Sequence, residues 1–100
     1  MIDRDFNKVI ITGYPKQKPE LKLTTTGTEV INFILVNEGV KSREYIDVTV
    51  WGELAEKVYK DIIPQRRIMV EGTLHHIGDA ARGRVEIRAN RVFSIGDKND

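Results

Sequence analysis

The stretch REYIDVTVW, residues 43–51, decides the predicted fold because its apolar residues alternate with polar ones. Ile46, Val48 and Val50 occupy every second position, which is the period of a strand that buries one face. The opposite face carries Tyr45 and Trp51, and Trp51 is the only tryptophan of the chain. The sequence therefore predicts a half-buried strand with an aromatic ring near each end of its outer face.

The period changes directly after this strand, in GELAEKVYKDII, residues 52–63. Apolar residues now recur four positions apart, at Leu54, Val58 and Ile62, so they form one stripe on a helix. Acidic residues lie near the predicted start and lysines near the end, which is favourable for the helix dipole. Pro64 ends the helix, since proline cannot continue its hydrogen bonding.

Four further segments are rich in β-branched and aromatic residues and are predicted as strands: 6–12, 29–37, 66–77 and 84–95. They are separated by a connection with two prolines, a turn and two loops, at 14–22, 24–28, 38–42 and 78–83. Three strands, one helix and two strands predict an all-β fold, the five-stranded Greek-key barrel called the oligonucleotide/oligosaccharide-binding (OB) fold, with one short helix between the third and fourth strands. An SH3-like barrel is the rival fold, but it usually lacks a helix of this length there.

The bulk composition is that of one soluble domain. The chain has 100 residues, a net charge of +1 and no cysteine, so neither a disulfide framework nor a cysteine-ligated metal is expected. Its start lacks the pattern of a secretory signal, and no apolar run is long enough to cross a membrane. We expect a single domain over 1–100, with its core at about 6–95 and a polar tail at 96–100.

Tyr45 and Trp51 share one face of their strand and lie about 20 Å apart, at about 3.3 Å per residue. A flat ring exposed on a sheet can stack on a nucleobase with little preference for its identity. Alternation alone leaves two interpretations open, a binding platform and a ring packed against the helix or another subunit. Phe6, Phe33 and Phe93 lie in apolar runs and are predicted to be core residues. Tyr59 is expected to pack beside the helix stripe. Tyr14 lies in a connection, and whether its ring packs or binds a ligand is left open.

A phosphate chain also needs cations beside the rings. The acidic residues concentrate on the helix and at the tail, so a small net charge is compatible with a polarised surface. Thr49, between the two rings on the same face, is counted with them. The basic candidates for nucleic-acid contacts lie on the strands and in the loops: Lys8, Lys22, Lys41, Arg43, Arg67, Arg84 and Arg88.

The sequence offers little for catalysis. His75 and His76 are neighbours on a predicted strand, so their side chains point to opposite faces and cannot easily bind one metal ion. There is no nucleophile signature and no glycine-rich phosphate loop. We therefore expect no enzyme activity, no metal site and no cofactor.

The segments NKVIITG, PELK, TTTGTEVINFILVN, EYIDVTVWGELAEKV and RRIMVEGTL, in this order, resemble the bacterial single-stranded DNA-binding protein family. The resemblance covers roughly residues 6–95. It implies an OB fold that binds single-stranded DNA without strong sequence preference, in replication, recombination or repair, by stacking bases on Tyr45 and Trp51. It further implies a cytoplasmic, nucleoid-associated homotetramer built from dimers that pair through the strand at 6–12, and replication or recombination proteins as additional partners.

The chain departs from the family pattern at several positions. The loops at 38–42 and 78–83 are short and have no aromatic residue, and Asp47 and Glu53 stand where family members often have cations. These differences imply weaker binding or a smaller site. The chain also stops at GDKND, without the acidic tail that family members usually carry, so it is either a trimmed form of a longer protein or a natural short relative. One such relative is primosomal replication protein N, a homodimer, and an adaptor of that kind would bind single-stranded DNA weakly and mainly dock replication proteins.

Overall fold

The computed structural model describes residues 4–96, and its central feature is a long hairpin. Strand β3 (Glu29–Glu38) and strand β4 (Arg43–Trp51) pair in antiparallel register from Val30 opposite Trp51 to Glu38 opposite Arg43. The bounds of β4 coincide with those predicted from alternation. Helix α1 (Glu53–Asp61) follows directly, beginning after Gly52, whose φ of 72° is readily adopted by glycine.

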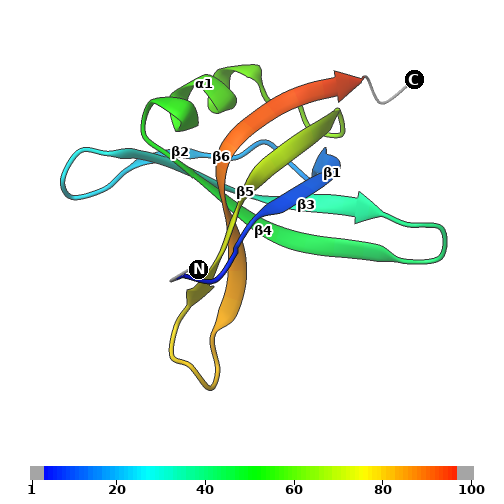
Figure 1. The fold of residues 1–100 in the computed structure, drawn as a ribbon. Helices are drawn as coiled ribbons and strands as arrows, with labels where there is room; N and C mark the ends of the chain where they lie inside the picture. Colours follow the sequence, from blue (N-terminus) through cyan, green and yellow to red (C-terminus); the bar gives the residue numbers. More distant parts are fainter. Residues whose placement is uncertain (1–3, 97–100) are drawn as a thin grey trace.

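The remaining strands complete one six-stranded sheet in the order β1-β5-β6-β4-β3-β2. Their bounds are β1 (Val9–Pro15), β2 (Leu21–Leu23), β5 (Arg67–Ile77) and β6 (Arg84–Gly96). The parallel pairing of β4 with β6 and the pairing of β1 with β3 close this sheet into a barrel, with α1 lying across one end (Figure 1). The fold is the predicted OB barrel, with β2 as a short additional strand that begins at the end of the predicted 14–22 connection and stops before the predicted turn at 24–28.

The barrel closes where β1 leaves β5 and reaches β3. Gly13 pairs with Ile68 of β5, and the next two residues, Tyr14 and Pro15, pair with Val36 and Leu35 of β3. A Cβ atom at Gly13 would meet the backbone carbonyl of Val36. The absence of a side chain at Gly13 therefore allows the two backbones to approach each other closely.

The predicted apolar stripe of the helix packs into the barrel. Ala55, Val58 and Ile62 are buried, with Leu54 and Tyr59 partly buried beside them. They join residues from the inner faces of four strands in one core: Ile31, Phe33, Leu35, Val48, Val50, Ile68, Val70, Ile87 and Ala89. Phe33 is thus a core residue, as predicted.

The other two phenylalanines were predicted wrongly. Phe6 precedes β1 and is 85% exposed. Phe93 faces outward because β6 contains one extra residue: Glu71 pairs with Arg91 and Gly72 with Ala89, so Asn90 has no partner on β5. This β-bulge reverses the alternation, which turns Phe93 out and Val92 towards the core.

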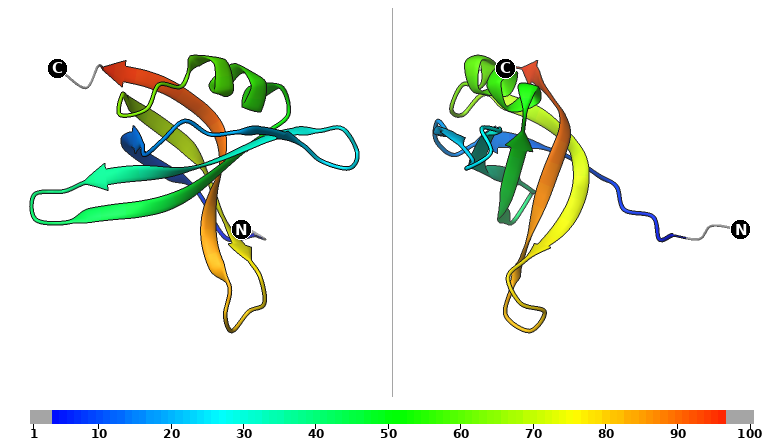
Figure 2. Two further views of the ribbon diagram at one scale, coloured as in Figure 1. Left: turned by 180° about the vertical axis from the view of Figure 1, so that it is seen from behind. Right: turned by 90° about the vertical axis from the view of Figure 1, so that its left-hand side faces the viewer.

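Long hairpins project from the barrel. The β3–β4 hairpin and the β5–β6 hairpin both reach beyond the body of the sheet, in different directions (Figure 2). Residues 4–96 include no helix long and apolar enough to span a membrane.

Candidate nucleic-acid interface

Both rings predicted to face away from the core do so. Tyr45 is 57% exposed and Trp51 is 41% exposed, so neither is sealed inside the chain. They lie near opposite ends of β4, about 20 Å apart by strand geometry. The outer surface of this one strand therefore carries two open π-faces.

The register of β2 and β3 places one predicted cation in line with Trp51. Trp51 pairs with Val30, and Val30 pairs with Lys22 on β2. Paired residues project from the same face of a sheet, so Lys22 and Trp51 share a face with Val30 between them. The Cα atoms of Lys22 and Trp51 are then about 10 Å apart, at two strand spacings.

A second cation reaches Trp51 from the other neighbouring strand. Arg88 pairs with Thr49 across the parallel β4–β6 contact. Its guanidinium carbon lies 5.8 Å from the centroid of the Trp51 ring, within the range of a cation–π interaction. The prediction placed Arg88 on a strand, and only the β4–β6 pairing brings it to the indole.

Lys16 occupies the equivalent place at Tyr45. Its ammonium nitrogen lies 5.6 Å from the centroid of the tyrosine ring. Lys16 belongs to the predicted 14–22 connection and was not among the candidate residues. The sequence signal was only a cluster of lysines, because the approach of this segment to β4 depends on the closure of the barrel.

Thr49 is buried, although its place between the rings predicted an accessible contact residue. It lies on the outer face, but only 2% of it is exposed. Its hydroxyl donates to Oδ1 of Asn32 at 2.8 Å. Arg88 and Trp51 lie beside it on the same face, so Thr49 supports the sheet and is not an accessible contact.

Three of the predicted arginines are held by carboxylates on this surface. Arg84 lies 3.3 Å from Asp47, Arg43 lies 2.6 Å from Glu38, and Arg67 lies 3.7 Å from the other oxygen of Glu38. A hydrogen bond to the hydroxyl of Tyr45, followed in strength by the one to Glu38, raises the pKa of the Arg43 guanidinium. All three arginine side chains are substantially exposed, and exposed ion pairs are weak, so a phosphate can compete with the carboxylates for these cations.

The other two lysines lie further from the rings. Lys41 is in the loop at the tip of the β3–β4 hairpin, beyond Tyr45. Lys8 precedes β1, where its ammonium is 4.0 Å from Glu71 of β5. Two strands, β5 and β6, separate β1 from β4 in this direction, so the structure does not bring Lys8 to the rings.

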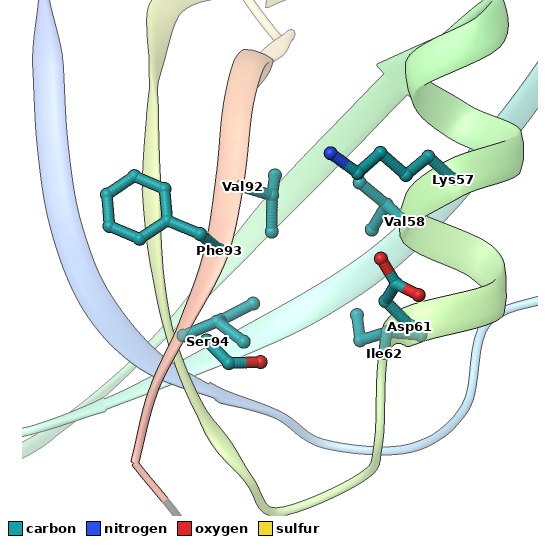
Figure 3. A pocket seen from close by; sticks show the side chains of 8 residues that line it. Lys57, Val58, Asp61, Ile62, Val92, Phe93 and Ser94 are labelled. Carbon is teal, nitrogen blue, oxygen red and sulfur yellow. The ribbon is translucent and has the colours of Figure 1, made fainter.

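The histidines and a cavity beside helix α1 lie outside this arrangement. His75 is hydrogen-bonded to Thr73 and His76 to the carbonyl of Asp79, and the part of the chain that the structure describes has no group of three or more residues suited to a metal ion. A cavity of about 170 Å³ lies between α1 and β6, with Val58, Ile62 and Val92 lining it and Phe93 at its edge (Figure 3). None of the candidate contact residues lines this cavity.

Comparison with known proteins bears on this surface. The model of the single-strand binding protein family matches residues 6–93. A single-stranded DNA-binding protein of Treponema pallidum is 28% identical over 104 residues, covering 92% of this chain and 59% of that protein. One from Deinococcus radiodurans is 32% identical over 103 residues, covering 89% of this chain and 34% of that protein. The chain thus spans about a third to three fifths of these relatives.

The fold agrees with these matches. The crystal structure of the wild-type single-stranded DNA binding protein from Thermus aquaticus superposes with a TM-score of 0.78 at 26% identity, covering 90% of this chain and 40% of that one. The family match extends from the segment before β1 into β6 and includes all of β4 with its two rings. On this evidence, the chain belongs to the single-strand binding protein family.

Proposed function

We propose that this chain binds single-stranded DNA with little sequence preference, by stacking bases on Tyr45 and Trp51. The observation that carries the proposal is the pair of exposed rings on β4, each with a cation within 6 Å of its centroid. A base stacks on the ring while the neighbouring cation contacts the phosphate next to it. The relatives named above as single-stranded DNA-binding proteins support the same function.

The remaining cations define a path for the phosphates. Lys22 and Arg88 flank Trp51, whereas Arg43, Arg67 and Lys41 lie towards Tyr45 and the hairpin tip. The bound single-stranded DNA would therefore run along β4 between these two groups of cations. Arg84 is held by Asp47 between the rings, where the carboxylate weakens the attraction for phosphates.

Titration of Trp51 fluorescence with oligo-dT tests the proposal directly. Stacking should quench the indole, and raising the salt concentration should weaken binding because phosphate contacts release counterions. Measured by mobility shift, since these variants lack the only tryptophan, Trp51→Ala should weaken binding by about 5- to 150-fold, the equivalent of ~1–3 kcal/mol for one stack, whereas Trp51→Phe should keep most of the affinity. No quenching and no mobility shift of the wild-type protein at low salt would reject this function.

We further propose that two copies associate through β1. Val9–Gly13 pair with β5 on one side only, and the side chain of Asn7 continues this attachment by bonding both backbone groups of Leu74 at 2.9 Å. The other edge of this segment has no partner strand within residues 4–96, and Ile10 beside it is 57% exposed. A second copy of β1 would pair with this edge and satisfy its unpaired backbone hydrogen-bonding groups.

This association is testable by light scattering. Ile10→Lys should shift the mass of the wild-type protein, a dimer or tetramer, towards the monomer. Val40→Lys provides the control, since Val40 is fully exposed in the β3–β4 loop and adds the same charge away from β1. A monomeric wild-type protein would contradict the proposal.

Membership of the family supports the prediction that the chain is not an enzyme. A role in DNA replication, recombination or repair, in the cytoplasm near the nucleoid, follows from single-stranded DNA binding and is proposed with it. The alternative role of an adaptor that mainly docks replication proteins is favoured by one observation, the partly apolar cavity between α1 and β6, with Phe93 exposed at its edge (Figure 3). Weak oligo-dT binding that is unchanged by Trp51→Ala would favour the adaptor.

A further inference from the structure

The closure of the barrel places a third aromatic ring in line with Tyr45. Tyr14 of β1 pairs with Val36 of β3, and Val36 pairs with Tyr45 of β4. The three residues therefore project from the same face, with Tyr14 about 10 Å from Tyr45 at two strand spacings. Val36 is only 2% exposed although it faces outward, as expected for a side chain flanked by two tyrosines.

A hollow of about 290 Å³ lies beside Tyr14. Glu38, Gln65 and Arg67 line it together with the tyrosine. The guanidinium carbon of Arg67 is 6.0 Å from the centroid of the Tyr14 ring. The hollow thus combines a π-face, a planar cation and two side chains that form hydrogen bonds, which are the groups that bind a nucleotide.

The segment that supplies Gln65 is held in an uncommon conformation. Gln65 has a φ of 67°, in the left-handed region that non-glycine residues seldom occupy. Its backbone N–H donates to the carbonyl of Pro15 at 3.1 Å, which attaches the segment after α1 to the end of β1. Such backbone strain is concentrated at functional sites, and here it fixes Gln65 and Arg67 beside Tyr14.

The charge around the hollow favours an anion. Arg43 and Arg67 share the single carboxylate of Glu38, at 2.6 Å and 3.7 Å, and Lys16 lies over Tyr45 on the adjoining surface. Two arginines therefore share one carboxylate beside the tyrosine rings, and a lysine lies over one of these rings. A phosphate that connects a base on Tyr45 to a base on Tyr14 would pass through this positive region.

We propose that Tyr14 and Arg67 form an additional nucleotide subsite, in which a base stacks on Tyr14 beyond the base held by Tyr45. The proposal rests on the proposed single-stranded DNA binding and extends its path from β4 onto β1. The path then runs from Trp51 through Tyr45 to Tyr14, over about 30 Å of sheet surface. The ring compensates for the aromatic residues missing from the short loops at 38–42 and 78–83.

Oligo-dT of increasing length separates this subsite from the other two. Oligonucleotides too short to cover all three rings can still bind across Trp51 and Tyr45 in Tyr14→Leu, so they should bind this variant nearly as well as the wild-type protein. Once the oligonucleotide is long enough to reach Tyr14, the wild-type affinity should rise further. Tyr14→Leu should not show this rise, so it should bind long oligonucleotides about 5- to 150-fold more weakly than the wild-type protein. Tyr14→Phe, which keeps the ring, should retain the gain.

Each outcome points to a separate conclusion. Equal affinities of wild type and Tyr14→Leu at every length would overturn the subsite, as would an equal loss at every length, which indicates a structural role for Tyr14. Failure of the wild-type protein to bind any oligo-dT would instead reject the proposed function. If Tyr14→Leu lowers the melting temperature, Arg67→Gln decides, because Arg67 is exposed and the subsite predicts that this variant loses more affinity for long oligonucleotides than for short ones.

Discussion

Arg88 on β6 lies over the indole of Trp51 on β4, with its guanidinium carbon 5.8 Å from the ring centroid. The two residues are 37 positions apart in the sequence, and the parallel β4–β6 pairing brings them together. The contact places a cation where a phosphate next to a stacked base would lie. The guanidinium also lies over the ring, so a base that stacks there, as proposed, would have to share the indole with the arginine or displace it.

Arg88→Gln should therefore weaken oligo-dT binding and flatten its salt dependence. Loss of one phosphate contact reduces the slope of log K against log[salt] by about 0.7 for a single strand. Arg91→Gln is the matched control, since Arg91 lies over Phe93 at 5.4 Å, away from Trp51. Fluorescence titrations at several salt concentrations measure both variants, and equal slopes for the two would contradict a phosphate contact at Arg88.

Asp47→Asn should have the opposite effect. Asp47 lies on the same face as both rings and holds Arg84 at 3.3 Å, so its removal frees a cation and deletes a negative charge beside the path. We expect tighter binding and a salt slope steeper by about 0.7. Asp61→Asn removes the same charge from α1 and should change little, whereas equal gains in the two variants would show only an effect of net charge.

Gly13→Ala should destabilise the barrel. The new Cβ atom would meet the carbonyl oxygen of Val36 and lie 3.1 Å from Cγ of Leu35, where β1 crosses to β3. Overpacking of this kind costs about 1–3 kcal/mol in the free energy of unfolding. Gly39→Ala, whose nearest contact is an ordinary 3.5 Å, is the control in urea denaturation. A Gly13→Ala variant as stable as Gly39→Ala would show that β1 can shift.

Glu29→Gln should stabilise the protein at neutral pH more than at acid pH. Desolvation raises the pKa of Glu29, and Glu56 in the first turn of α1 raises it further by repulsion. The folded state therefore binds a proton more readily than the unfolded chain, so the charged carboxylate opposes folding above its raised pKa. The melting temperature should rise at pH 7 in Glu29→Gln, and the gain should shrink towards pH 4. A gain independent of pH would exclude this cause, and Glu20→Gln controls for the loss of one charge.

Local periodicity predicted most of the secondary structure. Alternation at Ile46, Val48 and Val50 gave the bounds of β4, and the four-residue spacing at Val58 and Ile62 gave the buried stripe of α1. Both patterns are short-range, because a strand or a helix determines directly which of its side chains share a face. The order of these elements was enough to predict the OB barrel, and alternation placed Tyr45 and Trp51 on the outer face of β4 without deciding whether they are exposed.

Tertiary structure alone decided which residues became neighbours. The extra residue Asn90 turned Phe93 outward, the β4–β6 pairing covered Thr49 and brought Arg88 to Trp51, and the crossing at Gly13 set Tyr14 beside Tyr45. Each of these outcomes depends on strand register, and register is set by contacts between segments that are far apart in the chain. A single inserted residue reverses every side chain beyond it, so the pattern within one segment cannot determine which residues of another segment it will meet.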